Sequence, residues 1–534
     1  MRIKITQPEG TNQILLRDGK NNLLKSFELK ENFQRALRLL KQINSLKTLE
    51  GKPIYETEIF KGVSIWSFHQ QKLFYPSLCD YVKYEPVIKF LTETGIRKVK
   101  IEGELKKLPG FLRMSGFIVS NSSNRAGQIC LFFISSFIKL VIFLVNIFAF
   151  LKLFLGRIEV LVYTPDRFSK KYGCDFRFQA VYNHLDNKKV PYLEIFQTSL
   201  GTRFLKNLLK RRRLAVYLSG FPMFCAQRKN DKYELSIFES HNQKYFIYLL
   251  RKIAQESEKS VRRIRILSWF LKFTKIKTLL AMDDVRYTNE LIVACRINNI
   301  KTLGFQHGQF TKYHAGWMNY DIPKELSIVF DKLFVWNNYW KKILLRYSSQ
   351  YNEENVEIGG LLSQLKIIDY KKREEIIKNI SNLNILAPYE SYAPKKEVGI
   401  FLERFIELGV KIFFKARPDL SPQYQLNQYK IKLGENVELV EDINSQILSK
   451  IDAVVGTYST FLNEMIFYEK PLLILETSLD LGHCLIEDNL GLLIKKNFEP
   501  SFLLDYINNY QSKKEIAWPP SKIRLEEILE GLNL

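Results

Sequence analysis

The stretch at residues 302–310, "TLGFQHGQF", is a short apolar run that ends in a polar turn. An imidazole at the end of a strand can take a proton from a hydroxyl or give one to a leaving phosphate, and a neighbouring glycine lets a substrate approach the backbone. We therefore predict His307 as a catalytic residue, with Gln306, Gly308 and Gln309 in contact with substrate.

Two adjacent acids, Asp283 and Asp284 in "LLAMDD", end the preceding apolar run. Either could serve as the catalytic base in place of His307. Adjacent acids are also common at the start of a helix, where they cap it and complement its dipole. Asp166 and Arg167, after "VLVYT", have the same placement, and the sequence leaves the choice among these residues open.

A second candidate site is "GTYSTFLNE" at residues 456–464, where an apolar strand gives way through small residues to a helix. The first N–H groups of a helix have no partner within the helix, so such a turn can bind an anion. Ordinary helix capping explains the same residue types. We predict a phosphate site formed by the backbone and hydroxyls of Gly456, Thr457, Ser459 and Thr460.

The stretch "KARPD" places two cations, Lys415 and Arg417, after another apolar run, and we expect both to bind substrate. An arginine can neutralise a phosphate but cannot act as a neutral base. The sequence contains neither G-x-G-x-x-G nor G-x-x-x-x-G-K-[ST], so a standard dinucleotide site or P-loop is not indicated. His307 and His314 have no carboxylate at metal-ligand spacing, and no metal site is expected.

The elements that would position these residues alternate between strand-like and helix-like patterns. Strand-like runs occur at 60–68, 97–102, 157–166, 214–220, 278–284 and 300–308, and a second series at 383–391, 409–419, 436–442, 451–460 and 470–478. Apolar runs followed by polar residues are typical of parallel strands whose carboxyl ends face a cleft. We predict an α/β fold with two doubly wound Rossmann-type domains.

This pattern divides the chain into four parts. Residues 1–54 are expected to be a helical or irregular extension, and residues 55–360 an N-terminal Rossmann-like domain. Residues 361–380 are polar and follow a Gly-Gly pair, which is typical of a linker. Residues 381–534 are expected to form the C-terminal Rossmann-like domain.

One segment inside the N-terminal domain, residues 130–156, is apolar on all sides and carries only Lys139 and Lys152 as charges. Its length would cross a bilayer core of about 30 Å as a helix. Basic residues flank both ends, and a full crossing would separate residues that we assign to one domain. We therefore predict contact with membrane lipid, in the plane of the membrane or re-entrant.

The composition limits the classes of function. The chain has 534 residues, 46% of them hydrophobic, and a formal net charge of +24, which suits a globular protein with an anionic partner. The basic residues are spread along the chain, and the densest run, "KRRR" at 210–213, has few aromatic neighbours, so nucleic acid is not the expected partner. No secretory signal precedes the first strand, and the protein is expected on the cytosolic side.

Together, "TLGFQHGQF", "KARPD" and "VVGTYSTFLNEMIFYEKPLLIL" resemble the GT-B enzymes of bacterial surface-polysaccharide synthesis. That loose group includes capsule glycosyltransferases, polysialyltransferases and CDP-glycerol glycerophosphotransferases. The resemblance covers residues 270–500. Where much of the group has His-Pro after the second strand of the C-terminal domain, this chain has Arg417-Pro418.

The resemblance implies a membrane-associated glycosyltransferase on the cytoplasmic face of the plasma membrane. The C-terminal domain would bind a nucleotide sugar, with Glu464 on the ribose, and the N-terminal domain a glycan or lipid-linked acceptor. No cofactor and no metal would be needed. The alternatives are a CDP-glycerol-type phosphotransferase, a UDP-sugar 2-epimerase, and a basic membrane-bound binding module without enzymatic activity.

Overall fold

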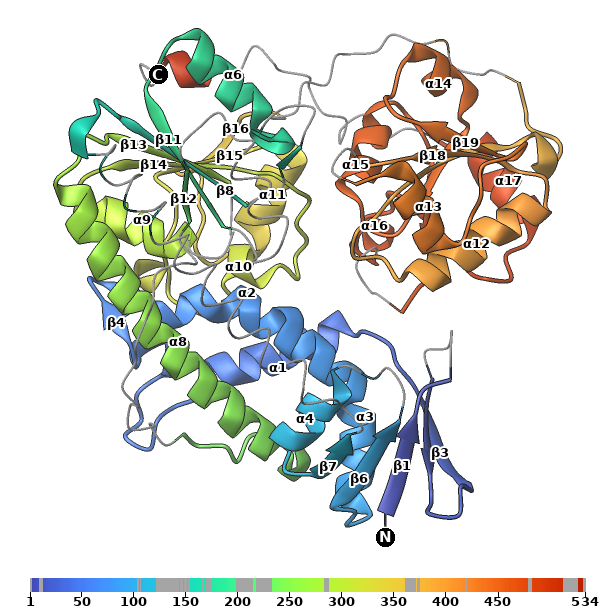
Figure 1. The fold of residues 1–534 in the computed structure, drawn as a ribbon, viewed down its shortest axis with the longest axis horizontal. Coiled ribbons are helices and arrows are strands. Elements are labelled where there is room, and N and C mark those ends of the chain that lie inside the picture. Colours follow the sequence, from blue (N-terminus) through green and yellow to red (C-terminus); the bar gives the residue numbers. More distant parts are fainter. Residues whose placement is uncertain are drawn as a thin grey trace.

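The computed structural model describes residues 2–8, 13–102, 105, 107–121, 144, 147, 151, 154–165, 168–169, 174–197, 215–217, 233–282, 288–360, 371, 375–417, 420–478, 483–511 and 527–531. These residues form three lobes (Figure 1). Two of the lobes are built on parallel sheets, and the third, at the N-terminus, on a mixed sheet.

The first parallel sheet has the strand order β12-β11-β8-β13-β14-β15-β16. Its strands are β8 (Val160–Pro165), β11 (Tyr192–Gln197), β12 (Ala215–Tyr217), β13 (Thr278–Met282), β14 (Lys301–Phe305), β15 (Lys332–Val335) and β16 (Val356–Ile358). The connecting helices include α6 (Gln179–Asn187), α9 (Thr288–Ile297) and α11 (Asn338–Tyr347). Every residue of β13 is buried, as expected for a strand covered on both faces.

The second parallel sheet has the order β19-β18-β17-β20-β21-β22. Its strands are β17 (Asn384–Pro388), β18 (Lys411–Lys415), β19 (Val437–Val440), β20 (Ala453–Gly456), β21 (Leu472–Leu475) and β22 (Leu492–Ile494). Its helices are α12 (Lys395–Glu407), α13 (Pro422–Tyr429), α14 (Ser445–Lys450), α15 (Thr460–Phe467), α16 (His483–Glu487) and α17 (Pro500–Asn508). The prediction of an α/β fold with parallel sheets is confirmed.

In both sheets the chain order reverses beside the first strand, between β8 and β13 and between β17 and β20. Open α/β sheets bind ligands at the carboxyl ends of strands next to such a reversal. The predicted site residues after β14, β18 and β20 therefore lie at the edges where this architecture places ligands.

The N-terminal lobe was not predicted. Its sheet has the order β3-β2-β1-β6-β7, with strands β1 (Arg2–Thr6), β2 (Gln13–Arg17), β3 (Leu23–Glu28), β6 (Lys98–Glu102) and β7 (Ile118–Asn121). The helices α1 (Phe33–Asn44), α3 (Cys79–Glu93) and α4 (Leu108–Met114) pack with it. The expectation of a helical or irregular extension at 1–54 is wrong, and so is the assignment of residues 97–102 to the first parallel sheet, because β6 pairs with β1 and β7.

Residues 60–68 also differ from the strand that we predicted. Lys61 and Gly62 both have positive φ, +52° and +77°, as in the tight turn of a two-residue hairpin. That turn joins the two-residue strands β4 (Ile59–Phe60) and β5 (Val63–Ser64). The apolar residues that follow, 65–69, then form a 3₁₀ helix instead of continuing a strand.

The remaining short elements are β9 (Phe168–Ser169), β10 (Cys174–Asp175), α2 (Gln70–Lys72), α10 (Ala315–Met318), a π-helical turn at Leu73–Leu78, and 3₁₀ turns at Ile54–Glu56, Phe176–Phe178, Lys324–Leu326 and Ile380–Asn382. Among the longer elements, α8 (Ser240–Lys272) reaches from the N-terminal lobe to the edge of the first parallel sheet (Figure 1). One apolar core runs through both of these lobes.

The end of the chain returns to the first parallel sheet, near α6 (Figure 1). Residues 527–530 are helical, and Leu529 is fully buried against the core of that lobe. Lys188 Nζ and Glu530 Oε1 lie 2.8 Å apart. The chain segments before and after the C-terminal lobe therefore both belong to the lobe of the first parallel sheet.

Most of the apolar segment at 130–156 lies outside the described residues. Within the ranges described, the structure contains no helix with the length and apolar character needed to cross a bilayer. Leu144, Ile147, Leu151, Phe154 and Leu155 do have helical backbone. The predicted lipid contact of this segment stays a prediction.

Candidate functional site

The loop after β14 and the turn before α15, which are far apart in the sequence, meet between the two parallel sheets. The side-chain amide of Gln309 donates a hydrogen bond to the Tyr458 carbonyl. Asn463 of α15 in turn donates from Nδ2 to Gln309 Oε1. Gly308 faces α15 as well, because a Cβ at this position would lie 3.8 Å from Thr460 Oγ1. The motifs "TLGFQHGQF" and "GTYSTFLNE" thus form one interdomain site.

Gln306 shapes the loop after β14 from inside the protein. Its buried side chain donates from Nε2 to the Gly308 carbonyl at 3.0 Å and accepts from the Trp336 backbone N–H at 3.0 Å. The Gln306 carbonyl accepts from Trp336 Nε1 at 2.8 Å. The predicted substrate-binding amide is therefore engaged within the protein, and it fixes the position of the next residue, the half-buried His307.

The other predicted catalytic residues, Asp283 and Asp284, lie outside the described residues, as do Asp166 and Arg167. His307 is therefore the predicted catalytic residue whose position the structure describes.

The turn at residues 456–459 is already occupied by a carboxylate of the same domain. Glu390, which follows β17 and is 2% exposed, accepts hydrogen bonds from the N–H groups of Thr457 at 2.7 Å, Tyr458 at 2.9 Å and Ser459 at 2.6 Å. Thr457 Oγ1 donates a further bond at 2.6 Å. Burial raises the pKa of Glu390, and these bonds oppose the rise.

These contacts correct the predicted phosphate site. Gly456 is needed for the approach of the carboxylate, because a Cβ there would lie 3.0 Å from Glu390 Oε1. Ser459 Oγ caps α15 by accepting from the Phe461 N–H. Two of the amides predicted to bind a phosphate, those of Thr457 and Ser459, are bonded to Glu390 instead. Any phosphate must be held by other groups.

A cationic corner lies at the carboxyl ends of β17 and β18. Lys395 Nζ donates to the Glu390 carbonyl, and Arg417 Nη1 donates to Ser391 Oγ. Burial, reinforced by the nearby Arg417, lowers the pKa of Lys395 to about 8, while Glu390 opposes the shift. Lys415, the last residue of β18, donates to the Glu441 carbonyl.

The side chain of Glu464, on α15, is partly exposed at the same edge. Burial raises its pKa to about 7, and Lys415 opposes the rise. Next to it, Asn463 is 4% exposed, and its Oδ1 accepts no hydrogen bond from the described residues. A buried carbonyl oxygen without a donor costs free energy, which a ligand hydroxyl or N–H could recover.

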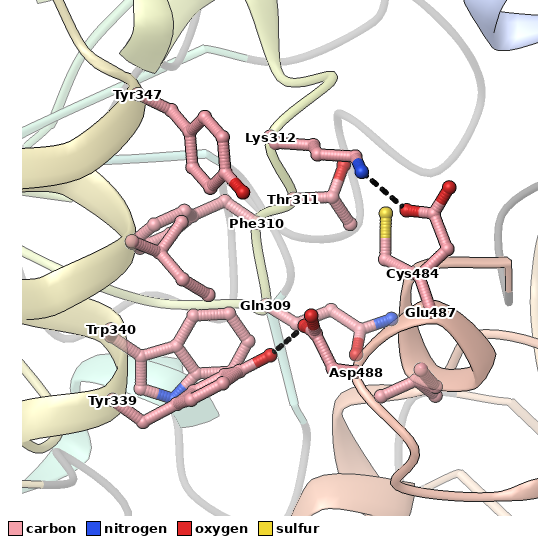
Figure 2. Close-up of a pocket in the computed structure, with 12 residues that line it drawn as sticks. Gln309, Phe310, Thr311, Lys312, Tyr339, Trp340, Tyr347, Cys484, Glu487 and Asp488 are labelled. Atoms are coloured by element: carbon pink, nitrogen blue, oxygen red, sulfur yellow. Dashed lines mark hydrogen bonds and ion pairs between the residues drawn. The ribbon is translucent and has the colours of Figure 1, made fainter.

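A pocket of about 470 Å³, part of it open to solvent, lies beside this meeting point (Figure 2). It is lined by the loop at 309–312, by Tyr339, Trp340, Ile343 and Tyr347 of α11, and by residues 484, 485, 487 and 488. The sequence did not point to this wall, because aromatic residues at helical spacing are also typical of a core.

Carboxylates at the end of α16 connect the two domains across this pocket. Lys312 Nζ lies 2.7 Å from Glu487 Oε2, and the Tyr313 hydroxyl donates to Glu487 Oε1 at 3.2 Å. The Tyr339 hydroxyl donates to Asp488 Oδ2 (Figure 2). Burial raises the pKa of the nearby Cys484 thiol to about 12, so this thiol is protonated and a poor nucleophile at neutral pH.

Within the described part of the chain, no group of three or more His, Cys, Asp or Glu side chains could hold a metal ion.

No protein-family model matches the chain. No curated protein matches its sequence significantly. Among solved structures, the chain is similar to MnaA of S. aureus in a structure with UDP, at 14% identity and a TM-score of 0.40, covering 70% of this chain and 96% of that one.

The chain is also similar to the UDP-GlcNAc 2-epimerase of Methanocaldococcus jannaschii, at 12% identity and a TM-score of 0.40, covering 70% of this chain and 99% of that one. A third similar structure is MurG of Acinetobacter baumannii, at 11% identity and a TM-score of 0.38, with 70% and 99% covered. TM-scores this low support no conclusion about activity, so the function must be argued from the site.

Proposed function

We propose that this chain is a glycosyltransferase of the GT-B type that moves a sugar from a nucleotide-activated donor to a glycan or lipid-linked acceptor. The observation that carries the proposal is the meeting of the His307 loop with α15 between two parallel sheets, close to a corner of half-buried cations. Such a site offers a proton-transferring group, hydrogen-bonding groups for hydroxyls and charge for phosphate, which are the parts that sugar transfer from a nucleotide requires.

The nucleotide would bind to the C-terminal domain. Arg417 and Lys395 would neutralise its phosphates, and Lys395, with a pKa of about 8, is mostly charged at neutral pH. The Glu464 carboxylate would accept from the ribose hydroxyls. Asn463 Oδ1, which has no donor among the described residues, would accept from a hydroxyl of the donor.

His307 would act on the acceptor. Its neutral imidazole would take the proton of the acceptor hydroxyl as that oxygen bonds to the anomeric carbon of the donor sugar. The bond between this carbon and the phosphate oxygen breaks, and the negative charge left on the nucleotide is stabilised by Arg417 and Lys395. The contacts of Gln309 and Glu487 across the cleft would help to exclude water, which otherwise hydrolyses the donor.

We further propose that the enzyme works at the cytoplasmic face of the plasma membrane, in the synthesis of a surface polysaccharide. The long apolar run at 130–156 and the net charge of +24 support attachment to an anionic bilayer.

Product analysis tests the proposal. Purified full-length protein is incubated with UDP-, GDP-, CDP- and CMP-activated sugars and membrane extract as acceptor, and the products are followed by NMR. We expect release of the nucleotide together with a new glycosidic linkage. A nucleotide sugar converted to its 2-epimer, or transfer of glycerol phosphate from CDP-glycerol, would contradict sugar transfer and identify the alternative.

A further inference from the structure

A cluster of large apolar side chains is exposed on the first parallel-sheet lobe, at the edge opposite the cleft. We call Leu151, Phe154, Leu155, Trp269 and Phe273 the aromatic edge. Leu155 is 86% exposed, Trp269 57% and Phe273 53%. Single exposed apolar residues are common, but clusters of them mark surfaces that contact another molecule or a membrane.

Two distant parts of the chain build the aromatic edge. The rings of Phe154 and Phe270 lie 6.2 Å apart between centroids, and Trp269 lies 5.0 Å from Phe270 and 5.3 Å from Phe273. Lys277 Nζ lies 2.8 Å from Glu159 Oε2, so the chain entering β13 lies beside the chain entering β8. The aromatic edge therefore lies at the amino ends of these strands.

The apolar segment at 130–156 also carries exposed apolar side chains. Leu144, Ile147, Leu151, Phe154 and Leu155 have helical backbone and follow each other at steps of three, four, three and one residues. In a helix, residues at these steps lie on one side. Their exposed fractions range from 39% to 86%. In a globular domain such side chains normally pack against the core, whereas these five are exposed.

Exposed cations accompany the aromatic edge. Arg157, Lys272 and Lys275 are exposed, and Lys272 Nζ lies 6.0 Å from the centre of the Phe273 ring. Trp and Phe side chains together with Lys and Arg are typical of surfaces that lie in the headgroup region of an anionic bilayer. Binding of a second protein chain would explain the exposed apolar side chains, but it would not by itself explain the cations beside them.

We infer that the aromatic edge is a membrane-interface surface, with Trp269, Phe273 and Leu155 among the lipids of an anionic bilayer and the cations on lipid phosphates. This inference rests on the proposed membrane location and adds an orientation to it. The cleft lies at the carboxyl ends of the same strands, and the six-residue β8 spans about 20 Å. An acceptor anchored in this bilayer must therefore extend away from the membrane to reach the cleft.

Vesicle flotation of the full-length protein tests the inference. The vesicles contain phosphatidylcholine alone or with about 30% of the anionic lipid phosphatidylglycerol, which gives them a negative surface potential. We expect W269E/F273E to lower binding to the anionic vesicles about tenfold, because the two aromatic side chains can no longer be buried in lipid. The matched control is Y424E/F502E, which changes two aromatic residues of the C-terminal lobe that are 49% and 55% exposed. It should bind as the parent does.

A second measurement does not depend on the charged variant being folded. Brominated lipid should quench part of the tryptophan fluorescence of the parent protein, and W269F should lose that part. Equal flotation of W269E/F273E and the parent, together with unchanged quenching in W269F, would overturn the inference. Loss of self-association in place of vesicle binding would also overturn it, since the partner would then be a second copy. Nucleotide binding by W269E/F273E should equal that of the parent, so a failure here is distinguishable from a failure of the proposed transferase site.

Discussion

The turn before α15 and the loop after β14 are both polar ends of buried strands, but they use their hydrogen-bonding groups differently. The turn is satisfied within its own domain, because Glu390 accepts from three consecutive amides. The loop reaches the other domain through Gln309, which bonds to Tyr458 and Asn463. A turn rich in N–H groups therefore indicates a ligand site only if no internal carboxylate reaches it.

We expect the largest effect from a substitution in the loop after β14, and we expect it on turnover. We expect His307→Ala to lower turnover by about 10² to 10⁴, the range for loss of a general base, with an unchanged melting temperature. Turnover of candidate nucleotide sugars and circular dichroism measure the two quantities. His314→Ala, in the same loop, is the control and should change turnover less. A folded His307→Ala protein with parental turnover would leave the loop with a structural role.

A substitution that disturbs the turn before α15 should lower the stability of the C-terminal lobe. Glu390→Gln places an amide NH₂ among N–H donors and removes a carboxyl oxygen that accepts from them, so we expect the C-terminal lobe to lose about 2 to 4 kcal/mol. Urea unfolding gives the free energy, and hydrogen exchange of the amides at 457–459 gives the local effect. Glu407→Gln, at an exposed pair with Arg404, should cost less than about 0.5 kcal/mol. Equal costs in the two variants would contradict the internal role of Glu390.

This contrast also shows how far the sequence could be read. The parallel strands were predictable because buried strands leave continuous apolar runs that end in polar residues. The pairing of Glu390 with the turn was not, because 67 residues separate Glu390 from Thr457 and no local pattern joins them. The first strand of the N-terminal lobe did carry a signal, since its fully buried residues Ile3 and Ile5 alternate with polar residues. In β2 the buried Ile14 and Leu16 are separated by another leucine, which hides the alternation. β1 and β2 have five residues each, so the alternation in them is too short to stand out.

Glu464 should affect stability in a pH-dependent way. Burial raises its pKa from the ordinary 4.5 to about 7, so the folded state binds the proton more tightly than the unfolded state. This preference adds to the free energy of unfolding below pH 4.5, and the added stability is lost as the pH rises to about 7. Glu464→Gln removes this loss, and we expect it to stabilise the protein by about 1 to 3 kcal/mol at pH 8 and to have little effect at pH 4.

Urea unfolding at the two pH values checks this expectation, with Glu403→Gln on the exposed side of α12 as the control. A gain in stability that is the same at pH 4 and pH 8 would show that the environment of Glu464 does not favour its protonated form.

The smallest effect concerns the bridge from the loop region to α16. Glu487→Gln weakens the contact with Lys312, whose side chain is 33% exposed, and we expect a cost of about 0.5 kcal/mol with faster hydrogen exchange in α16. Glu438→Gln removes a comparable ion pair with Lys411 inside one domain and should leave exchange in α16 unchanged. Identical exchange in both variants would mean that Glu487 does not hold the domains together.

Nucleotide titration of Arg417→Ala tests the central claim, that the cationic corner binds the donor phosphates while the turn before α15 is internally satisfied. The ligand is whichever of UDP, GDP, CDP and CMP raises the melting temperature of the parent protein most, since a ligand at 100 times its Kd adds about 2.7 kcal/mol of stability. Arg404→Ala, which removes an exposed arginine of α12, is the control. We predict that Arg417→Ala weakens nucleotide affinity about 10- to 100-fold and that Arg404→Ala does not change it. Parental affinity in Arg417→Ala would contradict the account.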